Sequence, residues 1–399
     1  MVNLPCEILK IFFWRNDKLK KTLALVLALV MVLGLAACNS TNSPTAPPAG
    51  SPGASNSGSV DIALITDVGN IDDHSFNQGT WEGVKQYADA NGLNAQYFRP
   101  TEDSDQARVE ATTSAIDKGA KVVVYPGFLF GPCLTQMQTA YPNVMFLGID
   151  MNDDATAGKA GDGTIAAATA NTTLIVFQEE QAGYLAGYAA VSDGYKQLGF
   201  MGGINVPAVV RYGYGFIQGA DQASADLGLA KGAVTIQYWY AGGFAPTDDI
   251  KNMANAWYTA GTQVIFSCGG GIYSSIVAAA QSANAKVIGV DVDQATIDPC
   301  IITSAMKGLG VAVVKALTDL YANNGTWPSA YAGKCQNLGA KDDAVGLPTA
   351  PDSWRLTTYT VDDYNTLYAK LVSGEIVVNN SSDPNTMPTT NLVTVNPVS

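Results

Sequence analysis

Basic residues, histidine and cysteine are all scarce in this sequence of 399 residues. Lys and Arg number 22 against 35 Asp and Glu, so the formal net charge is -13. Nucleic-acid binding needs clustered basic side chains that displace counterions from phosphates, and this class of function is therefore excluded. A single histidine excludes a His-rich metal site and leaves few routes to histidine-based catalysis. Six cysteines are too few for a disulfide scaffold.

The apolar run at residues 23–37 is too short for a transmembrane helix. It holds 15 residues, whereas a span needs about 20. Three lysines between residues 18 and 21 precede it and small residues end it, which is the pattern of a secretory signal. Leu35-Ala36-Ala37-Cys38 is similar to a bacterial lipobox, whose cysteine is lipidated and becomes the mature N-terminus. We expect a signal region at 1–37 and a lipid such as palmitate on Cys38; the alternative is an ordinary signal peptide with an incidental cysteine.

Residues 39–59 have no charge and no aliphatic side chain larger than alanine. Such a segment cannot bury enough surface to fold, so we expect a flexible tether of about 25 Å r.m.s. length. Removal of residues 1–37 would leave a net charge of -16. The expected location is the bacterial cell membrane, with the protein anchored by its lipid and facing the extracytoplasmic side.

From Val60 onward, short apolar runs alternate with stretches of helical periodicity. Continuous apolar strands between helices are typical of parallel sheets covered on both faces, so the predicted fold class is doubly wound α/β. One sheet of ten or more strands is too large, and we expect two lobes. The first comprises 60–172 and about 296–322, and the second comprises 173–295 and about 323–395. The tail predicts a strand over 355–360, then a helix capped by Thr360 with Asp363 three residues on.

In open α/β sheets, ligands bind beyond the carboxyl ends of the strands, and informative side chains follow several predicted strands. Asp67, Phe76 and Asn77 follow the first. Phe76 suits a stacking face and Asn77 a hydrogen-bonding group for a planar ring. The alternative is purely structural, with Asp73 or Ser75 as a helix N-cap and Phe76 as a hydrophobic staple.

The loop with Phe128 follows the predicted strand 121–125 and suits a pocket wall or an aromatic cap. Tyr212 follows a later strand, beside glycines that let its helix approach the sheet. Gly269 and Gly270 follow the strand 264–267 and allow close backbone approach. No Lys follows them at P-loop spacing, and nucleotide hydrolysis has no support. Cys268 has no His partner in the pattern, so a buried structural thiol is favoured over a nucleophile.

Asp291 lies at the end of a predicted strand and can accept hydrogen bonds from a sugar diol, with Lys307 donating to the same oxygens; a structural Asp–Lys pair is the alternative. No metal-ligand spacing occurs, and no cofactor is expected. Cys300 and Cys335 are candidates for an extracellular disulfide on the ground of compartment alone.

Several long motifs resemble those of the basic membrane protein family of bacterial lipoproteins, also called purine nucleoside receptor-like. They are T-D-x-G-x-x-D-D-x-S-F-N-Q at 66–78, F-x-E-E-Q-A-G-Y-L-A-G at 177–187, G-F-M-G-G at 199–203, V-P-A-V-V-R-Y-G-Y-G-F at 206–216 and I-G-V-D-V-D-Q at 288–294. The resemblance covers nearly all of residues 60–375. It implies a two-lobed fold like that of type I periplasmic binding proteins.

The resemblance also implies roles for the residues above. Phe76 and Tyr212 would sandwich a base, and Asn77 would hydrogen-bond it. Asp67, Asp291 and Lys307 would hold polar edges and the ribose, while Gly269 and Gly270 would let the backbone close over the sugar. Purine-binding relatives often carry an acid after the loop that contains Phe128. Here residues 131–133 are Gly-Pro-Cys, so the base is left undefined.

The function implied is that of a binding protein, without enzymatic activity, for an ABC importer. It would be a monomer that captures a nucleoside and delivers it to a permease with a separate ATPase. The alternative is a ligand-sensing lipoprotein that signals to a membrane partner. An enzyme of this fold would need a metal or an acid–base pair in the cleft, for which Asp72, Asp73 and Asp291 are the only candidates.

Overall fold

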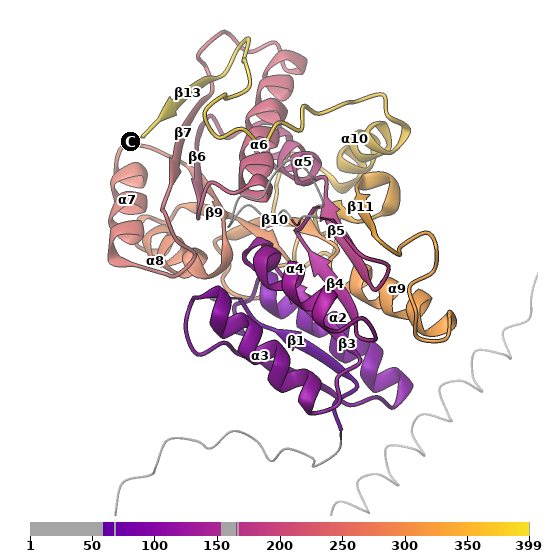
Figure 1. Ribbon diagram of the computed structural model, residues 1–399. Helices are drawn as coiled ribbons and strands as arrows, with labels where there is room; N and C mark the ends of the chain where they lie inside the picture. The colour runs from indigo at the N-terminus through magenta and orange to yellow at the C-terminus, as the bar shows by residue number, and fades with distance from the viewer. Residues whose placement is uncertain (1–58, 68, 153–164, 166, 399) are drawn as a thin grey trace, which may run out of the picture. The chain divides into compact units, whose positions relative to one another are not determined.

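Two sheets of mainly parallel strands form the protein (Figure 1), as the predicted α/β fold class requires. The computed structural model describes residues 59–67, 69–152, 165 and 167–398. In spatial order, the first sheet contains β11 (Lys334–Leu338), β5 (Thr172–Phe177), β4 (Met145–Ile149), β3 (Val122–Pro126), β1 (Ile62–Ile65) and β2 (Ala95–Phe98), all parallel. The second contains β12 (Val345–Gly346), β10 (Ile301–Lys307), β9 (Lys286–Asp291), β8 (Val264–Cys268), β6 (Gln197–Gly202), β7 (Thr235–Tyr240) and β13 (Thr394–Pro397). Only its β10–β12 pair is antiparallel.

Helices cover both faces of each sheet. On the first sheet, one face carries α2 (Phe76–Asn91) and α9 (Leu309–Ala322), and the other carries α3 (Asp105–Asp117) and α4 (Gly131–Ala140). On the second sheet, one face carries α5 (Glu179–Ser192) and α6 (Pro207–Asp226), and the other carries α7 (Asp248–Thr259) and α8 (Tyr273–Ala283). The helix α10 (Val361–Ser373) packs beside α5. Short 3-10 turns complete the fold: η1 (Phe128–Phe130), η2 (Gly270–Ile272) and η3 (Ala340–Asp342).

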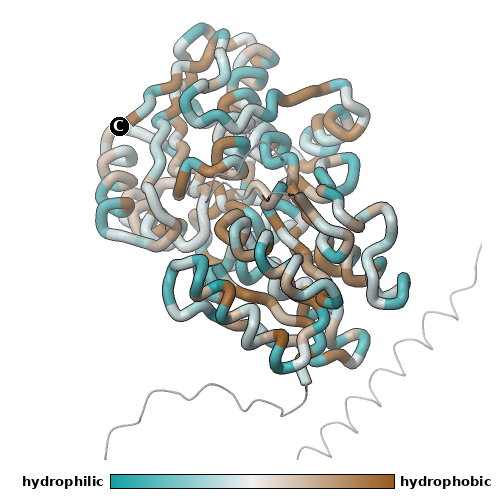
Figure 2. Tube along the Cα trace, in the orientation of Figure 1, coloured by the Kyte–Doolittle hydropathy of each residue, from teal (hydrophilic) through white to brown (hydrophobic). Residues whose placement is uncertain are grey.

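The strands are apolar throughout because both of their faces are buried. In β1, Ile62 and Leu64 join one core cluster, whereas Ala63 and Ile65 join another on the opposite face. Successive side chains of a strand point to opposite faces, so a strand between two helical layers shows no polar alternation. Figure 2 shows the resulting hydrophobic strands among helices with hydrophilic segments.

The helices α5 and α6 approach each other closely through glycines. A Cβ on Gly183 would lie 2.1 Å from the carbonyl oxygen of Tyr212, and one on Gly215 would lie 2.0 Å from that of Glu180. Gly213 faces the sheet instead, as the sequence suggested for this group of glycines. The two glycine-rich motifs therefore pack backbone against backbone, and the contact lies in the N-terminal halves of both helices.

The chain crosses between the sheets three times: at Gln178 before α5, at Gly308 before α9, and at Gly339 before β12. These crossings are joined by backbone hydrogen bonds. Gln178 N donates to Leu338 O at 2.9 Å, and Gly308 N donates to Ala344 O at 2.7 Å. We call the first sheet with α2, α3, α4 and α9 the first lobe, and the second sheet with the remaining helices the second lobe.

Three details of the predicted lobe boundaries are wrong, the first being that β11, expected in the second lobe with 323–395, belongs to the first sheet. The first lobe does not end at residue 172, because β5 pairs with β4 and β11 in the first sheet. The strand at 301–307 does not return to the first lobe, because β10 pairs with β9; only α9 returns and packs on α2. Strands buried on both faces look alike in sequence, so composition cannot tell which sheet a strand joins. The predicted signal region, the lipidation at Cys38 and the tether up to residue 58 lie outside the described residues.

The predicted strand at 355–360 is also wrong. Its amides bond to a side chain: the Asp193 carboxylate accepts hydrogen bonds from the N–H groups of Thr357, Thr358 and Tyr359. No neighbouring strand is then needed to satisfy them. The predicted cap of α10 is confirmed, since Asp363 N donates to Thr360 Oγ1 at 3.2 Å and Thr360 N donates to Asp363 Oδ2 at 3.1 Å.

Candidate functional site

A cavity of about 750 Å³ lies at the carboxyl ends of strands from both sheets. In each sheet the strand order reverses once, between β1 and β3 in the first and between β6 and β8 in the second. The loops after these four strands line the cavity, where doubly wound folds bind ligands. The volume suits one small organic molecule. We call this cavity the interlobe cleft.

All of the residues predicted to contact a ligand line the interlobe cleft: Asp67, Phe76, Asn77, Phe128, Tyr212, Gly269, Gly270, Asp291 and Lys307. They come from both lobes and from positions up to 240 residues apart in the chain. Acidic side chains outnumber basic ones in the lining, because Asp72, Asp73, Asp103 and Asp150 also contribute while Arg99 is the other basic residue. The cleft therefore presents mainly hydrogen-bond acceptors to a ligand.

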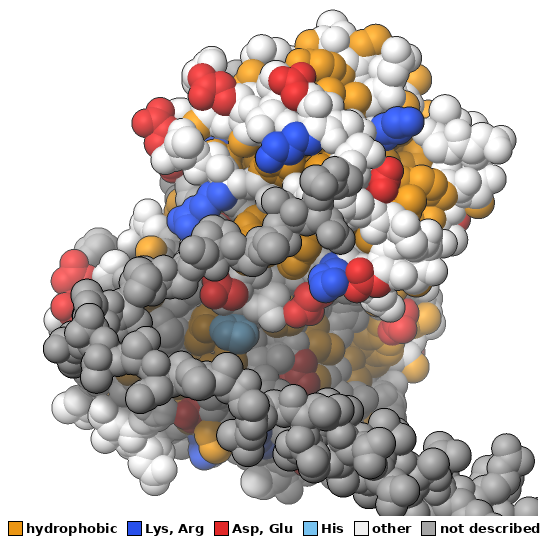
Figure 3. All heavy atoms as spheres, turned by 90° about the horizontal axis from the view of Figure 1, so that it is seen from below, with side chains coloured by type: hydrophobic (Ala, Val, Ile, Leu, Met, Phe, Trp, Pro, Cys, Tyr) orange, Lys and Arg blue, Asp and Glu red, His pale blue; other side chains and the backbone are white. Residues whose placement is uncertain are grey.

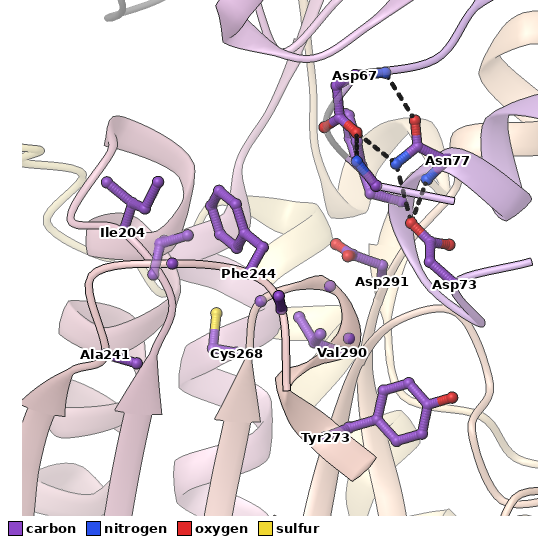
Figure 4. A pocket seen from close by; sticks show the side chains of 18 of the residues that line it. Asp67, Asp73, Asn77, Ile204, Ala241, Phe244, Cys268, Tyr273, Val290 and Asp291 are labelled. Atoms are coloured by element: carbon purple, nitrogen blue, oxygen red, sulfur yellow. Dashed lines mark hydrogen bonds between the residues drawn. The ribbon is translucent and has the colours of Figure 1, made fainter. Parts of the chain in front are cut away.

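Asp67 and Asn77 form one hydrogen-bonded unit at the start of α2 (Figure 4). Asn77 Nδ2 donates to Asp67 Oδ1 at 2.7 Å and to Asp73 Oδ2 at 3.0 Å, and Asn77 Oδ1 accepts from Asp67 N at 3.2 Å. Asp67 Oδ1 also accepts from Gly69 N at 2.6 Å. Both amide donors of Asn77 are thus used within the protein. In this arrangement Asn77 holds Asp67 in place, and Asp67 is the group presented to the cleft.

Removal from water raises the pKa of Asp67 to about 6, although hydrogen bonds from Gly69 and Asn77 act in the opposite direction. The nearby charge of Asp73 adds to the increase. A carboxyl group with this pKa changes its charge just below neutral pH. The acceptor strength of this part of the cleft is then pH-dependent.

Asp73 caps α2, as the structural alternative in the sequence proposed. Its carboxylate accepts from the N–H groups of Ser75, Asn77 and Gln78 at 2.9–3.1 Å. The other candidate cap, Ser75, has a different partner: Ser75 Oγ donates to Asp291 Oδ2 at 2.5 Å. Since Asp291 belongs to the second lobe, this bond links the two lobes across the cleft.

Lys307 is the central cation of the cleft. Its side chain is 2% exposed, and Nζ lies 2.5 Å from Asp150 Oδ2, 3.5 Å from Glu179 Oε1 and 3.7 Å from Asp291 Oδ1. Burial acts to lower the pKa of Lys307, but these three carboxylates outweigh it and raise the pKa. Burial raises the pKa of Asp150 to about 6 despite the ammonium beside it. Asp291 therefore shares Lys307 with Asp150 of the first lobe, whose carboxylate lies closer to Nζ.

Three aromatic rings surround the same ammonium group. Lys307 Nζ lies 4.7 Å from the ring centroid of Phe76, 5.6 Å from that of Phe177 and 5.8 Å from that of Tyr212. These distances are typical of cation–π contacts. Phe76 and Tyr212, which come from different lobes, are thus brought to one point of the cleft.

A second ion pair lies directly behind Lys307. Arg211 Nε contacts Glu179 Oε2 at 2.7 Å and Glu180 Oε2 at 3.8 Å. Burial, followed by the charge of Glu179, raises the pKa of Glu180 to about 7. Asp150 Oδ1, Glu179 Oε1, Glu180 Oε2 and Tyr212 Oη are buried without a hydrogen-bond partner among the described residues. Of these four residues, Asp150 and Tyr212 line the cleft, where their oxygens are open to a hydrogen bond with a ligand.

Gly269 and Gly270 contact an aromatic ring that the sequence did not single out. The backbone angle φ is +152° at Gly269 and +49° at Gly270, which favours glycine. A Cβ on Gly269 would lie 2.9 Å from Phe244 Cδ1. Phe244, from the loop after β7, also meets Phe128 of the first lobe, with ring centroids 6.4 Å apart.

Cys268 and Cys300 are buried, Cys335 is partly buried, and His74 is exposed. Cys268 is buried, which raises the pKa of its thiol. Cys300 is a free thiol in the core of the second lobe, whereas Cys335 lies on β11 of the first, so the candidate pair Cys300–Cys335 does not form. His74 is exposed, as Figure 3 shows for the single imidazole, and its ring lies edge-on to Tyr273.

Sequence reasoning did not assign a site role to Asp150, Glu179, Arg211 or Phe244. Asp150 offered one usable signal, since it directly follows β4 at the same sheet edge as Asp67. The other three gave none beyond membership of a motif or a loop. Within the described parts of the chain, no cluster of side chains suited to a metal ion is present. In the same residues, no helix is long and apolar enough to cross a membrane.

Comparisons with known proteins agree with this architecture. Residues 60–382 match the family described as "ABC transporter substrate-binding protein PnrA-like". An "ABC transporter nucleoside-binding protein BmpA" of Lactococcus lactis subsp. cremoris is 27% identical over 280 residues, which cover 64% of this chain and 73% of that protein. A "CD4+ T-cell-stimulating antigen" of Listeria innocua is 26% identical over 385 residues, 90% of this chain and 98% of that protein.

Among solved structures, a solute-binding protein of an ABC transporter system from Aeropyrum pernix K1 has a similar fold. The TM-score is 0.68 at 21% sequence identity, and the match covers 82% of this chain and 95% of that one. At this identity the likeness establishes the fold, which is the two-lobed type I periplasmic-binding-protein fold predicted from the motifs.

Proposed function

The chain belongs to the family of PnrA-like ABC transporter substrate-binding proteins, and from this premise we propose that its ligand is a nucleoside, with a purine base expected. The cleft would close around the ligand, and the protein would deliver it to a permease served by a separate ATPase. A lipid on Cys38 would keep the protein at the outer face of the cell membrane. The family is described as one of substrate-binding proteins, and we propose that this chain binds its ligand without enzymatic activity.

One observation carries the proposal: two aromatic rings from different lobes flank a cation that also faces three carboxylates. A nucleoside combines a planar base, which stacks on aromatic rings, with hydroxyl groups that donate to carboxylates and accept from an ammonium. Phe76 and Tyr212 would stack on the base. Lys307, Asp291 and Asp150 would hold the ribose, and Asp67 would accept from the base edge.

The acidic lining supports a neutral ligand over a nucleotide. Six aspartates line the cleft against Arg99 and Lys307, and Lys307 already has three carboxylate partners. A phosphate group would meet more acceptors than donors there and would be repelled. We expect the 5′-monophosphate of any bound nucleoside to bind far more weakly than the nucleoside itself.

Isothermal titration calorimetry tests the proposal with inosine, guanosine, adenosine, cytidine and free ribose. We expect at least one nucleoside to bind, and ribose to bind more weakly because it lacks the stacking base. Phe76→Leu keeps an apolar side chain at the start of α2 but removes the ring. Stacking contributes about 1–3 kcal/mol per base, so this variant should weaken binding by about 5- to 150-fold.

The matched control is Tyr97→Leu. Tyr97 is 49% exposed on β2 and pairs with Trp81 outside the cleft, so its removal should leave the affinity unchanged. Absence of binding to all four nucleosides would refute the nucleoside assignment. Binding that is equally tight in wild type and Phe76→Leu would refute the stacking role alone.

A further inference from the structure

A buried glutamine joins the two lobes beside the interlobe cleft. Gln294, the last residue of the motif at 288–294, donates from Nε2 to the carbonyl oxygen of His74 at 2.8 Å. His74 belongs to the loop before α2 in the first lobe, whereas Gln294 follows β9 in the second. The Gln294 side chain is 1% exposed. The proposed binding of a nucleoside gives this amide no role.

The second lobe fixes the orientation of the Gln294 amide. Val290 N donates to Gln294 Oε1 at 3.2 Å, and Gln294 N donates to Ser304 Oγ at 3.1 Å. Gly289 leaves the space for this side chain, because a Cβ there would lie 2.6 Å from Gln294 Oε1. Since the amide oxygen is engaged by Val290, the amide nitrogen is the group that reaches the first lobe. Gln294 is thus held by one lobe and bonds to the other.

Two neighbouring contacts extend this link between the lobes. Ser75 Oγ donates to Asp291 Oδ2 at 2.5 Å. One turn further along α2, Gly79 lies against Val292, because a Cβ on Gly79 would lie 2.9 Å from Val292 Cγ1. The start of α2 therefore packs on the loop after β9 through polar and apolar contacts together.

We call these contacts, between residues 74–79 of the first lobe and 291–294 of the second, the interlobe latch. Among the described residues that line the cleft, His74, Gly79 and Gln294 are not included. A substitution at one of these three positions therefore acts on the arrangement of the lobes without removing a group from the cleft lining.

We propose that Gln294 determines the ligand affinity without touching the ligand, because its hydrogen bond to His74 stabilises the closed arrangement of the lobes. The inference rests on the proposed closure of the cleft around a ligand, but not on which ligand is bound. When only a fraction of the molecules is closed, the apparent affinity falls in proportion to that fraction. The interlobe latch therefore changes the affinity for every ligand by the same factor.

The test compares the full chain with its Gln294→Met variant, whose side chain has a similar length but no Nε2 donor. Isothermal titration calorimetry measures the affinities for inosine, guanosine, adenosine and cytidine. Loss of one hydrogen bond should weaken each nucleoside that binds by the same factor, about 2- to 12-fold. Small-angle X-ray scattering of the ligand-free proteins should give the variant a larger radius of gyration, because fewer of its molecules are closed.

The matched control is Gln138→Met. Gln138 is 3% exposed on α4, its Nε2 donates to Ala167 O at 2.7 Å, and its Oε1 accepts from Thr169 N at 3.0 Å. This amide has the bonding pattern of Gln294, but both of its partners precede β5 in the first lobe. Its removal should therefore leave the nucleoside affinities and the radius of gyration unchanged.

A second variant weakens the interlobe latch from the first lobe. Gly79→Ala places a Cβ 2.9 Å from Val292 Cγ1 and 3.1 Å from Leu309 Cδ1. The closed arrangement can then form only if the loop after β9 moves away from α2. We expect the same uniform loss of affinity and the same increase in radius as for Gln294→Met. Gly79→Ala carries the test if Gln294→Met fails to fold.

The outcomes separate this inference from the proposed function. A wild type that binds none of the four nucleosides refutes the proposed function, and the radius of gyration then decides the inference alone. Radii that are equal in the wild type and both variants refute the inference, and so do nucleoside affinities that both variants leave unchanged. A loss of affinity in Gln294→Met that differs between nucleosides would mean that Gln294 acts through the ligand contacts, and would overturn its role in closure.

Discussion

Replacement of Lys307 by methionine tests the charge balance of the cleft. Methionine keeps most of the side-chain length but leaves Asp150, Glu179 and Asp291 without their shared cation. Removal of one partner from a buried ion pair costs about 3–5 kcal/mol, because the remaining charge stays desolvated. With three carboxylates involved, we expect Lys307→Met to lower the free energy of unfolding at pH 8 by an amount in this range.

The loss should shrink in acid. Burial already raises the pKa of Asp150 to about 6, and Lys307 acts to lower it, so the variant raises this pKa further. A carboxyl group whose pKa is raised on folding binds more protons in the folded state than in the unfolded state. Its stabilising contribution is then complete below the unfolded pKa and is lost as the pH rises through the folded pKa. The deficit of Lys307→Met should therefore be larger at pH 8 than at pH 5.

Urea unfolding followed by circular dichroism at both pH values measures this difference. The matched control is Lys315→Met, since Lys315 and Asp319 form an exposed pair on α9 with Nζ and Oδ2 2.8 Å apart. Such helical surface pairs contribute about 0.3–0.5 kcal/mol. The double variant Lys307→Met/Asp150→Asn should recover part of the stability. The reasoning is refuted if Lys307→Met costs no more than Lys315→Met, or if its cost is the same at pH 5 and pH 8.

Two further predictions concern the titration of the cleft and the packing of its supporting helices. Burial raises the pKa of Asp67 to about 6, so its contribution to stability is lost as the pH rises from about 4 to about 7. The unfolding free energy of Asp67→Asn should therefore increase relative to that of the wild type over this pH range. Parallel pH profiles of the two proteins would contradict this. Gly215→Ala places a Cβ 2.0 Å from the carbonyl oxygen of Glu180 and should lower the free energy of unfolding in urea by at least about 1–3 kcal/mol. The control Gly243→Ala, whose Cβ meets no atom within 4 Å, should leave it unchanged. Equal unfolding midpoints for the two variants would mean that α5 and α6 can move apart freely.

The sequence predicted which residues line the cleft, but it did not predict their hydrogen-bond partners. Asp67, Phe128 and Asp291 follow strands in the chain, and the carboxyl ends of parallel strands meet at one edge of a sheet, so their convergence could be expected. What each group bonds to could not. Asn77 was expected to reach the base, yet its amide donors go to Asp67 and Asp73. Ser75 was a candidate cap, yet its hydroxyl bonds to Asp291, 216 residues away.

Strand membership shows the same limit. The strand β5 was recognised by its composition but assigned to the wrong lobe, and the segment that forms β10 was assigned to the wrong lobe without being recognised as a strand. The edge strand β2, whose residues are partly buried or exposed, was not recognised at all. An apolar strand fits any interior position of a parallel sheet, and only its hydrogen-bonded neighbours decide which one it takes.

By itself, the sequence determined the scarcity of basic groups, the alternation of apolar strands with helices and the motifs of a nucleoside-receptor-like family. These are properties of local pattern and composition, which are read along the chain. The tertiary structure decided the pairing of Lys307 with Asp150, the contact of Phe244 with glycines from two loops, and the separation of Cys300 from Cys335. Each of these depends on distances between segments more than 20 residues apart, which the folded backbone sets and no local pattern records.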